Sequence, residues 1–222
     1  TPPFEPPSME ATPLPAVPKL TSRTIEALAA EPNSSEYALD LHNRGLKAIV
    51  ELAAATRLRS LDVSFNRLVA LENLEGAKEL RELRAYSNRI ARADDCAALA
   101  KLEVLLLSDN ALRAVPPTFA RLRHLRVLAL DRNRLAGGLE HLGACAALGR
   151  LSLAHNELAS LEGLRALPHL EELSLAGNRL ATLDGAGARA LGGCLKLAEL
   201  NLDDNELASL AGLRALEKAR AP

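Results

Sequence analysis

Leucine residues recur along most of the chain with a period of 22 or 23 residues, apart from one interval of 27. The residues eight, five and three positions before each Asn are nearly always Leu, and the residue two positions after it is Leu or Ile. The clearest copies read LGRLSLAHNELASL (148–161), LEELSLAGNRLATL (170–183) and LAELNLDDNELASL (197–210). The Asn residues stand at positions 66, 88, 110, 133, 156, 178 and 205. A fixed period of this length predicts a stack of similar structural units.

The alternation of Leu and other residues before each Asn predicts a short strand with two inward leucines. The Asn ends this strand, and its side-chain amide is expected to satisfy backbone groups where the chain turns. A degenerate first copy carries Arg44 in place of the Asn, which brings the count to eight. No coil buries its apolar face alone, so the copies should stack into one core. The leucines expected in its centre are Leu105, Leu107, Leu128, Leu130, Leu151 and Leu153.

These motifs resemble the leucine-rich-repeat family over about four fifths of the chain. The resemblance implies an α/β-type solenoid: a right-handed coil of about eight repeats, with a parallel sheet on the concave face. Short helical or 3-10 connections would form the convex face. The 22-residue period is similar to the subclass found in protein phosphatase 1 regulatory subunits and axonemal leucine-rich-repeat proteins, although VPPTFARLRHL (115–125) looks like the 23-residue class.

Composition divides the chain into three segments. Residues 1–20 hold seven of the twelve prolines and predict an extended arm, with an SH3-type ligand as the alternative to a plain linker. Residues 21–36 predict a capping helix and its connection, laying Ile25 and Leu28 over the first coil. Residues 37–222 form the expected solenoid. No closing helix follows Leu216, so we expect the rest of a longer chain or a partner to cover that end.

Outward positions on the central strands bring apolar side chains together inside a charged border. An apolar centre with a charged rim is typical of a protein-binding face. The alternative is that these residues simply suit strands. The candidate partner-binding residues are Tyr86, Arg84, Leu106, Val104, Val127, Asp131, Arg132 and Arg150.

Charge and composition exclude several other classes. The formal net charge is −1 and aromatic residues make up 2% of the chain with no Trp, so we expect no nucleic-acid partner. No apolar run is long enough to predict membrane insertion. The three cysteines stand at core positions and indicate a reducing compartment. The histidines have no metal-ligand spacing, and the glycines of 185–193 predict a flexible outer loop.

No catalytic or cofactor-binding motif is present, so we expect neither an enzyme nor a cofactor. The leading hypothesis is a non-catalytic interaction module or scaffold that binds a protein through its concave face. The resemblance favours a structural subunit of a large assembly, such as a ciliary axoneme, located in the cytoplasm or cytoskeleton. The alternatives are a regulatory subunit of an enzyme such as a phosphatase, or the interaction domain of a longer enzyme. Further contacts are expected at the C-terminal end and the Pro-rich arm.

Overall fold

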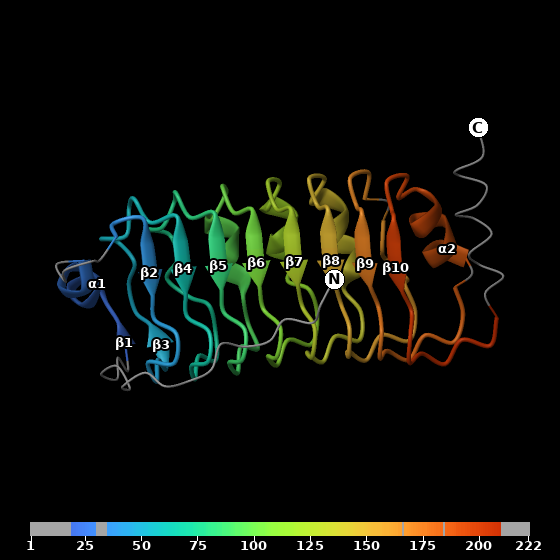
Figure 1. The fold of residues 1–222 in the computed structure, drawn as a ribbon, viewed down its shortest axis with the longest axis horizontal. Helices are drawn as coiled ribbons and strands as arrows, with labels where there is room; N and C mark the ends of the chain where they lie inside the picture. Colours follow the sequence, from blue (N-terminus) through green and yellow to red (C-terminus); the bar gives the residue numbers. More distant parts are fainter. Residues whose placement is uncertain (1–18, 30–34, 166, 184, 210–222) are drawn as a thin grey trace.

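The computed structural model describes residues 19–29, 35–165, 167–183 and 185–209. Its main feature is an eight-stranded sheet in which each coil contributes one short strand (Figure 1). All neighbouring strands run parallel and follow one another in the order of the chain. The strands are β2 (Ala38–Asp40), β4 (Ser60–Asp62), β5 (Glu82–Arg84), β6 (Val104–Leu106), β7 (Val127–Ala129), β8 (Arg150–Ser152), β9 (Glu172–Ser174) and β10 (Glu199–Asn201).

The register of the sheet matches the repeat. The middle residue of each strand is a Leu that pairs with the middle Leu of the next strand, as Leu105 does with Leu128. These leucines point into the coil and pack with the other repeat leucines in one continuous cluster. The six leucines expected at the centre of the core are all buried, which confirms the predicted register. Burial of this apolar surface is the main force that holds neighbouring coils together.

The repeated Asn side chains form a buried hydrogen-bonded ladder. Asn156 donates to the carbonyl oxygens of Leu153 in its own coil and Leu130 in the preceding coil, each at 3.0 Å. Its Oδ1 accepts the backbone N–H of Leu135 at 3.0 Å. The role predicted for the Asn is therefore confirmed, and the ladder also ties each coil to the one before. In the degenerate first copy, the backbone N–H of Arg44 donates to Oδ1 of Asn66 at 3.0 Å.

The residue directly before each ladder position has a positive φ angle. This left-handed backbone turns the chain out of the strand, and in most coils a small or polar residue occupies it. The eight residues are Asn43, Phe65, Ser87, Asp109, Arg132, His155, Gly177 and Asp204. The turn therefore carries one side chain beside the sheet in every coil except that of Gly177.

Short helices return the chain on the far side of the sheet (Figure 1). Three are 3-10 helices: η1 (Asp94–Ala98), η2 (Pro117–Arg121) and η3 (Leu139–Ala144). η2 packs between η1 and η3, as stacked coils require. The fourth is the α-helix α2 (Gly185–Gly192).

The prediction of a flexible loop over 185–193 was wrong, because this segment forms α2. Three glycines weaken the helix locally, but Leu191 and Ala190 are buried in the core and hold it. Gly187 also lies so close to the preceding coil that a Cβ there would stand 2.9 Å from Cβ of Leu161. The glycine therefore allows close packing.

At the N-terminal end, helix α1 (Ser22–Ala29) follows Thr21, whose Oγ1 accepts the backbone N–H of Thr24 at 3.2 Å. Ile25 is buried and Leu28 partly buried against the core. The strand β1 (Lys19–Leu20) pairs with β3 (Ala48–Ile49) in a second, two-stranded parallel sheet.

The last two residues of the expected 1–20 arm therefore belong to the packed structure, because Leu20 is fully buried. The rest of that arm lies outside the described residues. Leu210, Leu213 and Leu216 also lie outside them, so the expectation about the C-terminal end stays a prediction.

Candidate functional site

The surface of interest is the sheet face, which we define as the outward strand residues together with the two residues before each ladder position. Register places the predicted apolar residues side by side. Val104 pairs with Val127, Leu106 pairs with Ala129, and Arg84 pairs with Leu106. All four apolar side chains are half-buried. The structure therefore brings the predicted apolar centre together on β5, β6 and β7.

Arg84 is exposed, and its guanidinium is held by acids of its own strand and of the neighbouring strand. Its Nε donates to Oε1 of Glu82 at 2.8 Å, and its Nη2 lies 2.7 Å from the same oxygen. Its Nη1 is 3.9 Å from Oδ2 of Asp62 on the neighbouring strand. The hydrogen bond with Glu82 raises the pKa of the guanidinium, so this charge is permanent. The side chain is thus positioned beside Leu106 by two acids.

Asp131 has a structural role that the sequence analysis did not foresee. One carboxylate oxygen accepts the hydroxyl of Ser152 and the backbone N–H of Ala154, the latter at 2.9 Å. The other oxygen accepts the hydroxyl of Ser108 at 3.1 Å. Asp131 therefore ties three coils together at the edge of the sheet face. Its three partners lie in the preceding and following coils. The spacing of residues within one repeat does not show which residues of different coils meet.

The two remaining predicted arginines lie at the border of the apolar centre, where Arg150 pairs with Val127 across β7 and β8. Arg132 is exposed on the left-handed turn, one residue before Asn133, with φ 51°. Arg150 lies on β8, where its Nε is 2.8 Å from Oε1 of Glu172. Both residues belong to the sheet face, but neither contacts Tyr86 or Leu106 in any hydrogen bond or ring contact of the described structure.

Three aromatic side chains meet at the edge of the sheet face, and we call them the aromatic edge: His42, Phe65 and Tyr86. The rings of His42 and Phe65 have centroids 4.9 Å apart, and those of Phe65 and Tyr86 are 5.3 Å apart at 82°. Edge-to-face packing of this kind is favourable. The sequence analysis identified Tyr86 but missed Phe65 and His42. A Phe at the turn position, where other coils carry mostly polar residues, was the available signal.

A Ser, His and Asp also stand together beside the aromatic edge. The hydroxyl of Ser64 donates to Oδ1 of Asp62 at 2.5 Å, and Nδ1 of His42 lies 3.2 Å from the same hydroxyl. In a nucleophilic triad the histidine stands between the acid and the hydroxyl, whereas here the acid binds the hydroxyl directly. Ser64 is also fully buried. A substrate could not reach its oxygen, so this cluster holds the turn and does not carry catalysis.

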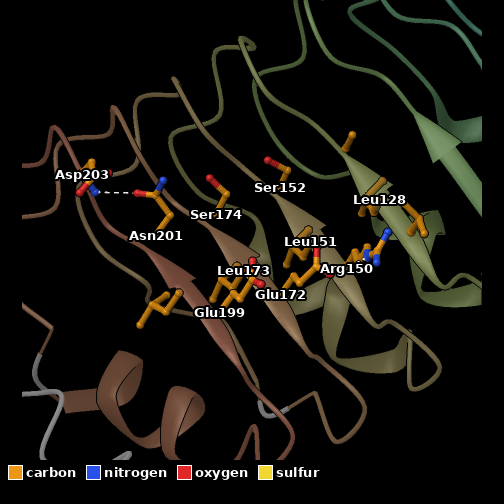
Figure 2. Close-up of a pocket in the computed structure, with 13 residues that line it drawn as sticks. Leu128, Arg150, Leu151, Ser152, Glu172, Leu173, Ser174, Glu199, Asn201 and Asp203 are labelled. Carbon is orange, nitrogen blue, oxygen red and sulfur yellow. Dashed lines mark hydrogen bonds and ion pairs between the residues drawn. The ribbon is translucent and has the colours of Figure 1, made fainter. Parts of the chain in front are cut away.

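A hollow of ≈ 720 Å³ lies farther along the sheet face, over β7 to β10 (Figure 2). Short side chains on neighbouring strands leave this space, notably Ala129, Ser152 and Ser174. Asn201 closes one end, where its Oδ1 accepts the backbone N–H of Asp203 at 2.9 Å. Val127 and Arg150 line this hollow and were predicted as partner-binding residues, whereas its other lining residues were not.

The sheet face is acidic although the whole chain is nearly neutral. Its basic residues are Arg84, Arg132 and Arg150. Its nine acidic residues are Asp40, Asp62, Glu82, Asp109, Asp131, Glu172, Glu199, Asp203 and Asp204. The face therefore carries an excess of six negative charges, against a net charge of −1 for the chain. The rest of the sequence contains five more basic than acidic residues, which follows from the same counts.

Other kinds of site were searched for in the same part of the chain. Among the described residues, no group of three or more His, Cys, Asp or Glu could hold a metal ion. In the same residues, no helix combines the length and apolar character needed to cross a membrane. The three cysteine side chains are buried and unpaired, and burial raises the pKa of the Cys145 thiol to about 11.

The comparisons with known proteins agree on the fold. A family model for leucine-rich repeats in two copies matches residues 148–187. No curated protein sequence matches the chain. An internalin of Listeria monocytogenes is 23% identical with a TM-score of 0.68, covering 82% of this chain and 59% of its own. A leucine-rich-repeat protein of Leptospira interrogans is 22% identical with a TM-score of 0.67, covering 83% and 58%.

Internalin C2 of Listeria monocytogenes is 20% identical with a TM-score of 0.69, and 86% of each chain is covered. At these identities the likeness concerns the fold, which is a leucine-rich-repeat solenoid. The chain spans somewhat less than three fifths of the first two structures. The finer resemblance to the 22-residue subclass stays a prediction.

Proposed function

Because the chain folds as a leucine-rich-repeat solenoid, we propose that it is a non-catalytic interaction module that binds a partner protein through its sheet face. The observation that carries this proposal is the apolar centre of Val104, Leu106 and Val127. These side chains lie on adjacent strands and point away from the core. Arg84 and Tyr86 lie beside them in the preceding coil.

The apolar centre is partly exposed to water in the free protein, and a partner that covers it would remove this exposure. Outward side chains of a sheet cannot enter the core, so Leu106 stays partly in water in the free protein. Covering such a patch with an apolar surface is favourable by about 25 cal/mol for each Å² removed from water. Tyr and Arg beside a dry patch are the side chains that most often dominate binding. Tyr86, Leu106 and Arg84 should therefore contribute most to the affinity.

The other predicted residues would border this contact. Arg150 and Arg132 lie toward the next coils and are exposed, so they are available to the rim of an interface. Asp131 would act indirectly, by holding the coils that carry the patch. A helix, loop or extended segment of the partner would lie across the strands, because the patch runs from β5 to β7.

Within this proposal, the preferred role is a structural subunit of a large assembly, with a ciliary axoneme as the example that the repeat period suggests. A regulatory subunit of an enzyme such as a phosphatase is the alternative, as is the interaction domain of a longer enzyme. An intracellular location suits the three buried thiols. Additional contacts at the C-terminal end and the Pro-rich arm belong to the same proposal. Size-exclusion chromatography separates the two roles, since a regulator should be monomeric without its enzyme.

The test is quantitative capture of partners from cell lysate with three forms of the tagged chain. The first is the native chain and the second carries Tyr86→Ala and Leu106→Ser. The third carries His124→Ala and His169→Ala, two exposed positions away from the sheet face. The native chain and the histidine variant should retain the same proteins, and the sheet-face variant should lose them.

Partners identified in this way are then titrated against each purified form, with a thermal melt to show that all three are folded. The proposal is overturned if the sheet-face variant keeps the partner while the histidine variant loses it.

A further inference from the structure

The aromatic edge contains a residue that the fold does not require. Phe65 has φ 53° and 45% of its surface exposed. Its counterparts at the same turn are mostly small or polar residues, for which a left-handed backbone is less strained. A bulky aromatic residue in this backbone conformation is more strained than glycine. Strained residues of this kind concentrate where they serve a function.

Carboxylates surround the aromatic edge and are held in fixed positions. Asp40 accepts the backbone N–H of His42 at 2.9 Å, and Asp62 accepts the backbone N–H of Ser64 at 2.9 Å. On the next coil, Asp109 accepts the hydroxyl of Ser87 at 3.0 Å. The bonds to Asp40 and Asp109 each engage one carboxylate oxygen, whereas Asp62 also has the guanidinium of Arg84 3.9 Å from its second oxygen.

The molecule already contains an arginine site of the same composition. The guanidinium groups of Arg57 and Arg59 lie 5.3 Å and 5.0 Å from the ring centroid of Tyr37. Arg57 also pairs with the carboxylate of Glu36 at 2.8 Å. An aromatic ring next to a carboxylate thus binds arginine within this chain, through cation–π and charge attraction together.

The aromatic edge has the same two components but lacks the cation. Among the described residues, no arginine or lysine lies over the ring of Phe65 or Tyr86. The nearest candidate, Arg84, is turned toward Glu82. Asp62 is already near Arg84, but no ion pair of the described residues involves Asp40 or Asp109. These two carboxylates and the exposed part of the Phe65 ring are therefore open to a cation from outside.

We infer that the aromatic edge binds an arginine or lysine side chain of a partner segment, whose apolar residues lie on the neighbouring centre at Leu106. This inference rests on the proposed function and names the chemistry of the partner. The excess of six negative charges on the sheet face attracts a basic segment over the same surface. The same charges repel an acidic segment and the phosphates of a nucleic acid.

The test uses peptides of defined charge as probes. One acetylated and amidated peptide alternates arginine and leucine, and its counterpart alternates glutamate and leucine. The chain contains three Phe, two Tyr and no Trp, so the aromatic NMR signals of Phe65 and Tyr86 are readily assigned. The arginine peptide should shift both sets of ring signals, and the glutamate peptide should shift neither.

Three variants then locate the site by calorimetric titration of the arginine peptide. Phe65→Asn removes the ring, keeps the charge and suits the left-handed turn. Asp62→Asn removes the charge but keeps the acceptor that Ser64 needs. Each should weaken the affinity about three- to thirty-fold, the range of one cation–π or charge contact. Val69→Asn, at an exposed apolar residue outside the edge, is the control and should leave the affinity unchanged.

The inference fails if the glutamate peptide binds as tightly as the arginine peptide. It fails equally if Phe65→Asn binds the arginine peptide as the native chain does. Neither result bears on the proposed function, which fails if the Tyr86→Ala, Leu106→Ser variant keeps the captured partners and the His124→Ala, His169→Ala variant loses them.

Discussion

The ring of Phe65 packs edge to face against the ring of Tyr86, with centroids 5.3 Å apart and planes at 82°. The two residues occupy different places in the repeat, since Phe65 precedes the ladder Asn by one residue and Tyr86 precedes the next by two. Stacking of the coils brings these positions together across the turn. His42 and Tyr86 both lie two residues before a ladder position, and Phe65, from a different position of the repeat, joins them in one cluster.

Replacement of a central core leucine should destabilise the whole solenoid. Leu151 is buried between neighbouring coils. Leu151→Ala should lower the free energy of unfolding by about 2–5 kcal/mol, through lost apolar burial and the cavity left behind. Urea denaturation followed by circular dichroism measures this change. Ser174→Ala, at a half-buried outward position, is the control and should change it by less than about 0.5 kcal/mol.

Removal of one ladder Asn should be nearly as damaging, although little apolar surface is lost. Asn156→Ala leaves the N–H of Leu135 and the carbonyls of Leu130 and Leu153 without their partner inside the coil. We expect a loss of about 2–4 kcal/mol in urea denaturation. Asn205→Ala should cost less, because Asn205 is only partly buried and water can replace its bonds. Equal losses at both positions would contradict this account of the ladder.

The turn glycine of the seventh coil should not tolerate a larger residue. Gly177 has φ 65°, and a Cβ there would stand 2.3 Å from Nδ1 of His155. Gly177→Ala should lower stability by about 1–2 kcal/mol from backbone strain, with a further loss from the clash. Adding His155→Ala should restore only the part of the stability that was lost through the clash. Gly149→Ala, where a Cβ meets nothing closer than 3.7 Å, should leave the melting temperature unchanged or slightly raised.

The cysteines should be unreactive in the folded protein. Burial disfavours the charged thiolate, so it raises the pKa of Cys145 to about 11 and also raises the pKa values of Cys96 and Cys194. At pH 8 the fraction of Cys145 in the reactive thiolate form is then on the order of one in a thousand. A colorimetric thiol reagent should label none of the three within minutes in buffer and all three in denaturant. Rapid labelling of the native chain would show that the core opens.

The sequence by itself determined the repeat, the register and the core. A period of 22 or 23 residues with Leu at fixed offsets leaves one arrangement in which every coil buries its leucines, so Leu105, Leu128 and Leu151 were predictable. The same alternation identified which strand residues face outward, including Leu106 and Tyr86. These features depend on spacing within one repeat, which the sequence states directly.

Only the tertiary structure decided which side chains of different coils meet. Asp131 reaches serines of two neighbouring coils, and Phe65 reaches His42 and Tyr86, because stacking and the left-handed turn fix their directions. Helix α2 likewise forms although its glycines disfavour it, since burial of Leu191 outweighs their local preference. Contacts between coils depend on how the coils pack against one another, and the spacing of residues along the chain does not predict that packing.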